Sequence, residues 1–318
     1  MNPGSRSGQS RRSFHKIRQI LDREKINYDL EITKSLEEAY QLSLEGNSAG
    51  YDVIVAVGGD GTINRVLNGF YGLDGRRCSK AKFGVVYTGT SPDFCKSYDI
   101  PLSIDEAVRA VLKQRTKKIQ VGKIVYAEDC LEELDGKPVC DEPESGARFI
   151  TRYFACCANI GIGAALARKA NSGIRGVLGD KLGTFMALVR TLISYRSVDY
   201  LICADGKRER VSKVHNISVG KTFHIASGIK VQHQLENGDH RLYRFTVQNI
   251  KLRALPGIIN KIYSGKRVVN NEMMSLDYLK MIEVLGNKRN PELEFDGDPA
   301  GYLPCRISMA DDDLELIY

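Results

Sequence analysis

The sequence predicts an α/β domain with a parallel sheet, followed by a second domain that is mainly β and sandwich-like. The apolar run Val53–Val57 is typical of a strand buried on both faces, and helical spacing of apolar residues follows it. Strands then alternate with helices, which favours a parallel sheet, whereas the pattern beyond Val198 is rich in strands. We therefore expect residues 1–121 to form the first domain, with 308–318 returning to it, and residues 122–307 to form the second.

The composition indicates a globular protein suited to binding anions. Of its 318 residues 42% are hydrophobic and 27% charged, and a net charge of +7 suits a phosphate-rich ligand or an anionic membrane surface. There is no secretory signal and no apolar run of about 20 residues, which a membrane-spanning helix needs. The eight cysteines form no CxxC pair, so free cytosolic thiols are expected rather than zinc ligands. No GxSxG motif supports a hydrolase, and no basic array interleaved with aromatic residues favours nucleic acid.

Capping signals and apolar spacing define the other elements of the first domain. Ser13 precedes a run with helical spacing, and capping boxes open further helices at Ser35 and Ser103. The segment Tyr28–Thr33 and the apolar run Phe83–Tyr87 predict strands. The expected helices extend to Leu21, Leu44 and Gln114.

The second half of the chain predicts further strands and one clear hairpin. The hairpin turn is Asp205-Gly206, because an Asp-Gly pair between two extended runs favours a tight turn. The acidic stretch Glu128–Gly146 predicts an exposed loop. Strands are expected at Phe149–Ala158, Val198–Ala204, Glu209–Val219 and Leu314–Tyr318, and a helix at Asp180–Tyr195.

The turn Gly58-Gly59-Asp60-Gly61-Thr62 between the first buried strand and its helix is suited to holding a phosphate. Glycines let the backbone approach an anion closely, and a helix N-terminus adds partial positive charge. The turn lacks the lysine of a GxxxxGK[ST] loop and the spacing of GxGxxG. A carboxylate beside phosphates is repulsive unless it binds a metal or orients water, so we interpret Asp60 as a residue that coordinates magnesium or water. The alternative is a tight turn in which Asp60 caps the helix.

Four motifs, in this order, resemble those of the bacterial diacylglycerol kinase-like lipid kinases, part of the superfamily of diacylglycerol kinases, sphingosine kinases, phosphofructokinases and NAD kinases. The first is GGDGT, and the second is Gly89–Phe94, GTSPDF, where the family has GTxNDF. The third is the turn Asn159–Ala164, and the fourth is Asp296-Gly297-Asp298, where the family has DGE. The resemblance covers nearly the whole chain, and it also implies a strand at Lys117–Tyr126 and a short helix at Leu255–Lys266. It implies a nucleotide-binding α/β domain with a phosphofructokinase/NAD kinase-like parallel sheet, followed by the β sandwich-like domain.

This resemblance implies phosphoryl transfer from ATP with Mg²⁺, and it assigns roles to the matching residues. Asp296 would be the general base that takes the proton from a lipid hydroxyl, with Asp298 in support and Asp60 acting at the phosphates. The carboxylates of Asp60, Asp93 and Asp239 would hold the metal. The nucleotide would contact Asn2, Thr33, Gly58, Gly59, Asp60, Gly61, Thr62, Asn64, Gly89, Thr90 and Asp93.

Some positions depart from the family pattern. Pro92 stands where the family has asparagine, Gln120 where it has aspartate, and Arg65 where it has glutamate. An Asp-Gly pair also suits a plain β-turn, and a helix cap is the alternative role for the aspartate of GTSPDF. The family has a hydrophobic strand before its N-terminal loop, so either residues precede Met1 or the sheet lacks its first strand.

The implied function is an ATP-dependent lipid kinase acting on diacylglycerol or a related long-chain alcohol in phospholipid metabolism. Its partners would be a nucleotide and a lipid at a membrane surface, without nucleic acid, and a homodimer is left open. We expect a cytoplasmic protein in peripheral association with the inner membrane surface. Two alternatives stay open. One is a non-catalytic nucleotide- or lipid-binding protein of the same fold. The other is a soluble-substrate NAD kinase-like enzyme, whose Asn-Glu pair would be Asn271-Glu272.

Overall fold

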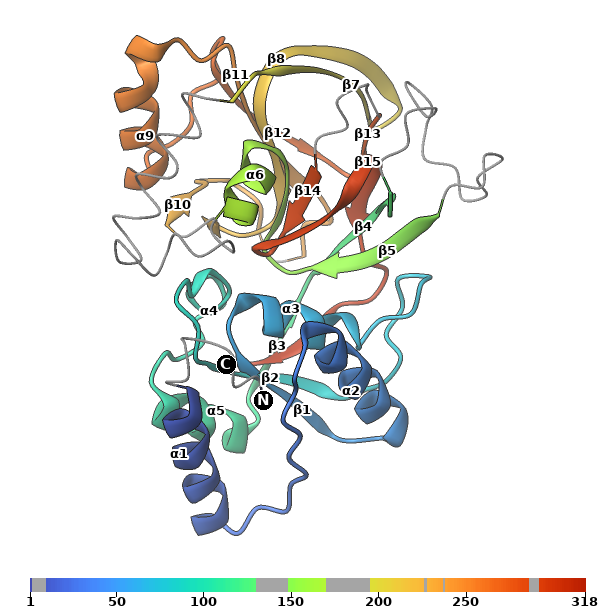
Figure 1. The fold of residues 1–318 in the computed structure, drawn as a ribbon, viewed down its shortest axis with the longest axis vertical. Coiled ribbons are helices and arrows are strands. Elements are labelled where there is room, and N and C mark those ends of the chain that lie inside the picture. Colours follow the sequence, from blue (N-terminus) through green and yellow to red (C-terminus); the bar gives the residue numbers. More distant parts are fainter. Residues whose placement is uncertain (2–9, 130–147, 170–194, 226–227, 237, 286–291) are drawn as a thin grey trace. The chain divides into compact units, whose positions relative to one another are not determined.

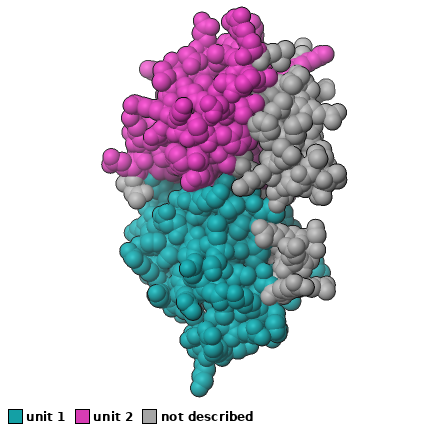
Figure 2. Space-filling model, turned by 90° about the vertical axis from the view of Figure 1, so that its left-hand side faces the viewer, with its two compact units in different colours: residues 1–121, 310–318 teal, residues 122–309 magenta. Residues whose placement is uncertain are grey.

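The chain divides into two compact units. The computed structural model describes residues 1, 10–129, 148–169, 195–225, 228–236, 238–285 and 292–318. The first unit comprises residues 1–121 and 310–318, and the second comprises residues 122–309 (Figure 2).

The first unit contains a four-stranded sheet with helices on both faces (Figure 1). Its elements are α1 (Ser10–Arg23), α2 (Leu36–Ala49), β1 (Val53–Gly58), α3 (Asp60–Asn68), β2 (Lys82–Tyr87), α4 (Asp93–Ser97), α5 (Ile104–Lys113), β3 (Thr116–Ile119) and β16 (Leu314–Ile317). The strand order is β1-β2-β16-β3.

This sheet is mixed, and the prediction of a parallel sheet is wrong at β3. β1 pairs with β2 and β2 with β16 in parallel, but β16 and β3 are antiparallel. The reason is the route of the chain, which leaves for the second unit after β3 and returns from it along β16. Two strands that carry the chain out and back in this way run in opposite directions.

The core of the first unit lies on both sides of its sheet. α1 and α5 pack against one face through a cluster that includes Ile17, Val57 and Val86. α2 and α3 lie together on the other side (Figure 1). Their contact includes a hydrogen bond in which the Ser43 hydroxyl donates to the Val66 carbonyl at 2.6 Å. The β1–turn–α3 segment is thus held from both faces.

The capping box predicted at Ser35 is present in part. The Ser35 hydroxyl accepts a hydrogen bond from the Glu38 N–H at 3.1 Å, as the motif requires. The Glu38 carboxylate, however, accepts from the Lys34 N–H at 2.6 Å. The helix continues beyond the predicted end at Leu44 and stops at Gly50, whose φ of 82° ends it in the left-handed region.

The strand predicted at Tyr28–Thr33 does not form. A strand needs a ladder of consecutive hydrogen bonds with a neighbour. Among the described residues, the backbone bonds of this segment go to Met1, which donates to the Glu31 carbonyl at 2.7 Å and accepts from the Thr33 N–H at 2.8 Å. Two bonds to one residue do not make a ladder of consecutive bonds.

The second unit is β-rich, as predicted, and its strands are antiparallel. The elements before the long hairpin are β4 (Gly122–Ala127), β5 (Phe149–Phe154), β6 (Cys157–Gly161) and α6 (Ile162–Lys169). Those that follow are β7 (Val198–Ala204), β8 (Lys207–Gly220), β9 (His224–Ile225), β10 (Ile229–Lys230), β11 (Leu242–Gln248), η4 (Leu252–Ala254), α9 (Leu255–Ser264), β12 (Met274–Leu279), β13 (Ile282–Val284), β14 (Glu292–Phe295) and β15 (Asp298–Met309). β7 pairs with both β13 and β8, so the strands β8-β6-β14-β15-β13-β7 close around a core.

Two predicted strands are each split in the structure. The run Lys117–Tyr126 becomes β3 and β4, which belong to different sheets because the chain passes between the two units after Val121. The run Phe149–Ala158 becomes β5 and β6, because the N–H groups of residues 155–157 bind a side chain instead of a neighbouring strand.

Some predictions lie outside the described residues, namely positions 180–194 of the expected helix and 130–146 of the expected loop. Among the helices that are described, none is long and apolar enough to cross a membrane.

The return of the chain as β16 generates a stability prediction. Leu316 is fully buried and pairs with both Phe83 and Lys117. Leu316→Ala should lower the free energy of unfolding of the first unit by about 2–5 kcal/mol, because it removes core contacts and leaves a cavity. The exposed Asp313→Ala should change it by about 0.5 kcal/mol or less. Urea unfolding followed by circular dichroism measures both, and equal effects would contradict a core role for β16.

Candidate functional site

Two glycine turns of the first unit lie in direct backbone contact. β1 ends at Gly58 and α3 begins at Asp60, while the turn after β2 contains Gly89. A Cβ atom on Gly89 would lie 2.6 Å from the Gly59 Cα atom, so only glycine fits this approach. The Thr88 N–H donates to the Gly58 carbonyl at 2.8 Å and carries the strand ladder into the turns. The structure thus brings the predicted GGDGT and GTSPDF segments together.

Asp60 is the first residue of α3, and it does not cap that helix. The N-cap is Gly59, which makes no side-chain capping bond. The half-buried Asp60 carboxylate accepts a hydrogen bond from the Tyr87 hydroxyl at 3.3 Å. That hydroxyl also accepts from the Ser91 N–H and therefore connects the two glycine turns. Burial and the negative charge of Asp60 raise the pKa of Tyr87, which keeps it a neutral donor.

The other predicted nucleotide contacts differ in their surroundings. Thr62 and Asn64 are buried, and the Asn64 side chain accepts from the Asn68 amide at 3.2 Å. Thr90 is exposed, and Asp93 is the half-buried first residue of the short helix α4. Gly61 is the second residue of α3. The buried Thr33 hydroxyl donates to the Met1 carbonyl at 3.2 Å. Asn2 lies outside the described residues.

In the second unit, Asp296 and Gly297 form the turn between β14 and β15 with left-handed backbones. Their φ angles are 50° and 90°. The Asp296 carboxylate accepts three backbone hydrogen bonds, from the N–H groups of Ala155 at 2.8 Å, Cys156 at 2.9 Å and Cys157 at 3.2 Å. Three such donors favour the ionised carboxylate and fix its orientation. The side chain of Asp298 lies outside the described residues.

A second turn in the same unit repeats this geometry. Asp205 and Gly206, in the predicted hairpin, have φ angles of 47° and 81°. The Asp205 carboxylate accepts from the N–H groups of Lys280 and Met281, both at 2.9 Å. An Asp-Gly turn whose carboxylate accepts hydrogen bonds from backbone N–H groups thus occurs twice in this unit, and the Asp205 turn provides a matched comparison for Asp296.

The sequence prediction missed a buried polar group beside the Asp296 turn. Glu294, Asn159 and Ser218 lie on the neighbouring strands β14, β6 and β8 and are buried. The available signal was Glu294 itself, a charged residue between two core residues in ELEF. Tyr87 was also missed, since it ends a strand that was interpreted only as core.

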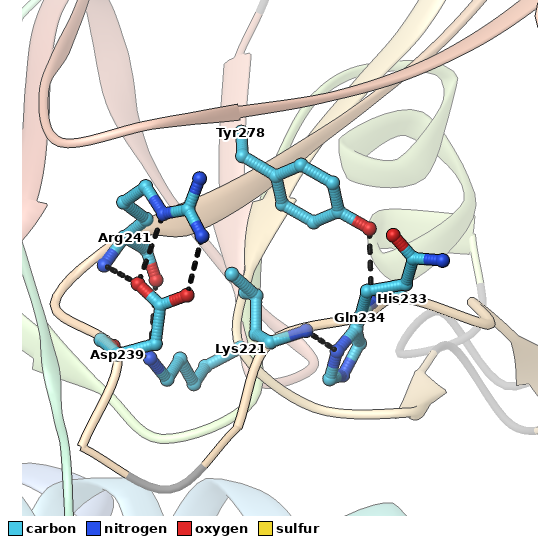
Figure 3. A network of polar contacts seen from close by, with 7 residues as sticks. Lys221, His233, Gln234, Asp239, Arg241 and Tyr278 are labelled. Carbon is cyan, nitrogen blue, oxygen red and sulfur yellow. Dashed lines mark hydrogen bonds and ion pairs between the residues drawn. The ribbon is translucent and has the colours of Figure 1, made fainter.

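Asp239, the third predicted metal ligand, forms an ion pair with Arg241 (Figure 3). The Arg241 guanidinium donates to its carboxylate at 2.7 Å and 3.0 Å and lies 5.6 Å from the centre of the Tyr278 ring. The Lys221 ammonium donates to the backbone carbonyls of Asp239 and Arg241. Within the described parts of the chain, no group of three or more His, Cys, Asp or Glu residues could hold a metal ion. A metal at Asp239 stays a prediction, and it would have to displace Arg241.

The Asp239–Arg241 pair generates a pH prediction. Arg241 lowers the pKa of Asp239 to about 2, whereas the pKa of an unfolded aspartate is about 3.9. The pair therefore stabilises the fold above the unfolded pKa, and this stabilisation is lost as the pH falls through the folded pKa. The difference in melting temperature between the wild type and Arg241→Gln should be constant from about pH 7 to pH 5 and disappear towards about pH 2. A difference that does not vary with pH would contradict the pairing.

Comparison with protein families gives two matches along the chain. Residues 1–124 match the model of the diacylglycerol kinase catalytic domain. Residues 157–318, about half of the chain, match the YegS C-terminal NAD kinase beta sandwich-like domain. The first match contains both glycine turns, and the second contains the Asp296 turn.

Curated relatives and solved structures agree with these matches. A diacylglycerol kinase of Staphylococcus haemolyticus is 36% identical over 74 residues, which are 23% of this chain and 21% of the relative. One from Staphylococcus aureus is 31% identical over 126 residues, which are 39% of this chain and 38% of the relative. The chain thus matches well under half of these relatives' length.

The structural similarity extends over the whole chain at low identity. A crystal structure of a diacylglycerol kinase from Bacillus anthracis aligns with 100% of this chain and 94% of its own, with a TM-score of 0.66 and 20% identity. Two further structures from that organism align with a TM-score of 0.72. These structures show the same fold, and the two family matches show that the chain belongs to the diacylglycerol kinase-like family.

Proposed function

We propose that this protein is an ATP-dependent lipid kinase that transfers the γ-phosphate to the hydroxyl of diacylglycerol or a related long-chain lipid alcohol. The family supports a phosphotransferase with an alcohol acceptor. The observation that carries the proposal is the backbone contact of Gly59 with Gly89 beside the Asp60 carboxylate. Two side-chain-free turns at the carboxyl ends of adjacent parallel strands are suited to binding phosphates.

The nucleotide phosphates would lie on the backbone of residues 58–62, with Thr90 close to them. The first N–H groups of α3 and its positive dipole end favour anions at this position. Asp60 is fixed there by Tyr87 and would act on the phosphates through a metal or a water. This arrangement supplies the positioning and charge neutralisation on which phosphoryl transfer mostly depends.

The donor set of the first unit fits Mg²⁺, because this ion is usually held by one or two carboxylates together with substrate phosphates. Asp60 and Asp93 would hold it, each as the first residue of a helix that follows a glycine turn. When bound, Mg²⁺ would neutralise negative charge on the transferred phosphate.

Asp296 would accept the proton of the lipid hydroxyl, with Asp298 in support. The three N–H donors hold its carboxylate in one orientation. Kinases require an oriented carboxylate more than a strong base, since the acceptor proton moves as phosphoryl transfer proceeds. The lipid acceptor implies that the reaction takes place at a membrane surface, which we propose is the cytoplasmic face of the inner membrane. A homodimer is compatible with this proposal.

Two alternatives are weighed against specific observations. A non-catalytic nucleotide- or lipid-binding protein is favoured by the Asp205 turn, which shows that the Asp296 geometry also occurs without an assigned chemical role. A soluble-substrate NAD kinase-like enzyme is disfavoured by the local structure at Asn271. The Asn271 side chain accepts from the N–H groups of Met273 and Met274 at 2.8 Å and 3.0 Å, so it stabilises a turn.

Asp296→Asn tests the catalytic assignment. The rate of phosphate transfer should fall at least about 100-fold because the proton acceptor is lost, while the Kd for ATP stays within about threefold. Radiolabelled transfer to lipid vesicles and calorimetric ATP titration measure the two quantities. Asp205→Asn is the matched control. It should reduce stability comparably, because both carboxylates bind backbone N–H groups, and leave the rate unchanged. A wild-type rate for Asp296→Asn would refute the assignment.

The acceptor is tested by offering labelled ATP with separate vesicles containing diacylglycerol or a sphingoid base, and with NAD in solution. Label should appear in a lipid, because a general base that accepts a hydroxyl proton would serve no purpose in a nucleotide-binding protein that does not transfer phosphate. Label in NAD would favour the soluble kinase. ATP that binds but is not consumed with any acceptor would favour the non-catalytic protein.

A further inference from the structure

A row of buried polar side chains crosses three neighbouring strands of the second unit. Glu294 on β14 is the register partner of Asn159 on β6, and Asn159 is the register partner of Ser218 on β8. Their exposed fractions are 5%, 3% and 3%. Burying a carboxylate and an amide in a sheet is unfavourable unless each finds hydrogen-bond partners, so their contacts identify what the row does.

A chain of hydrogen bonds in this row runs from Gly163 to Glu294. The Gly163 N–H, in the first turn of α6, donates to Asn216 Oδ1 at 2.9 Å. Because a backbone N–H can only donate, it fixes the orientation of the Asn216 amide. Asn216 Nδ2 then donates to Asn159 Oδ1 at 3.2 Å, and the Ser218 hydroxyl donates to the same oxygen. Asn159 Nδ2 is left to donate to Glu294 Oε2 at 2.6 Å.

The row ends at the turn that contains Asp296. The other carboxylate oxygen of Glu294 accepts from the Gly297 N–H. Both Glu294 oxygens therefore accept a hydrogen bond, an arrangement that favours the ionised carboxylate. The buried Glu294 carboxylate thus holds the second residue of the turn from one side, while the N–H groups of residues 155–157 hold Asp296 from the other.

We propose that Glu294 is a positioning residue for Asp296. Its negative charge, stabilised by the aligned amides of Asn159 and Asn216, fixes the left-handed Asp296-Gly297 turn and ties it to the first turn of α6. The catalytic consequence rests on the proposed lipid kinase function, but the structural consequence does not. Glu294→Gln would place a carboxamide nitrogen against either the Gly297 N–H or Asn159 Nδ2, so that two donors face one another.

The first measurement needs no activity. In Glu294→Gln, amide hydrogen exchange of Gly297 and of residues 155–157 should become about tenfold faster, since one buried hydrogen bond to the turn is lost. Combining it with Asn159→Asp reverses the polarity of the pair, because the new carboxylate accepts from the new carboxamide as well as from Ser218 and Asn216. The double variant should return exchange to within about twofold of the wild type. Asn159→Asp alone places two carboxylates against each other, so exchange in this single variant should stay faster than in the wild type.

The second measurement uses phosphate transfer by the full chain. Glu294→Gln should lower kcat about 10- to 100-fold through misplacement of Asp296, with the KM for ATP within about threefold of the wild type, and the double variant should recover most of kcat. If the wild type transfers phosphate to no lipid, the proposed function fails, and the exchange data still decide the role of Glu294.

Glu283→Gln is the matched control. Glu283 is a second buried carboxylate of the same sheet, 8% exposed and paired with Arg306 at 2.7 Å. This variant should lower the melting temperature without changing exchange at the Asp296 turn. Unchanged exchange in Glu294→Gln, or faster exchange that the double variant does not reverse, would overturn the proposal. If neither Glu294 variant folds, Ser218→Ala replaces them, and unchanged exchange at Gly297 would overturn it.

Discussion

The capture of the Asp296 carboxylate by three backbone N–H groups is the constraint around which the second unit is organised. Residues 155 and 156 lie between β5 and β6, and together with Cys157, the first residue of β6, they donate their N–H groups to Asp296. The same bonds hold a turn whose first residue is a non-glycine in the left-handed region, a conformation that needs compensation. An interrupted strand and a strained turn thus stabilise each other, and both present the carboxylate proposed to act in catalysis.

In the first unit, the candidate site depends on the absence of side chains at two glycines. Gly59 and Gly89 approach each other more closely than a Cβ atom would allow. What remains between the turns is the Tyr87 hydroxyl, which donates to Asp60 and accepts from Ser91. One unit thus brings two glycine turns together beside a carboxylate, and in the other unit backbone N–H groups bind a carboxylate. This contrast fits the phosphate site and the fixed proton acceptor proposed above, respectively.

Local patterns predicted the local structure, and partners distant in sequence account for the errors. The buried strand before GGDGT, the cap at Ser35 and the Asp205 hairpin each depend on residues a few positions apart, and all three were predicted. The segment Tyr28–Thr33 has strand composition, but a strand requires a neighbour, and its backbone bonds go to Met1. The break after Phe154 depends on Asp296, and the partner of Glu294 is Asn159, so no local pattern reveals either. The family resemblance predicted the order of the motifs, but it did not predict the buried polar row of Glu294, Asn159 and Ser218.

The Asp205 and Asp296 turns show why geometry at one residue does not establish a catalytic role. Both aspartates have a backbone in the left-handed region, both precede a glycine, and both accept hydrogen bonds from backbone N–H groups. The difference lies in what supports the glycine that follows. Gly297 is held by the buried Glu294, which accepts from the Asn159 amide, and Asn159 in turn accepts from the Asn216 amide. Burying a carboxylate is unfavourable, and an Asp-Gly pair forms this kind of turn without one, as at Asp205. We therefore attribute the presence of Glu294 to the need to hold the neighbouring Asp296 carboxylate in one orientation.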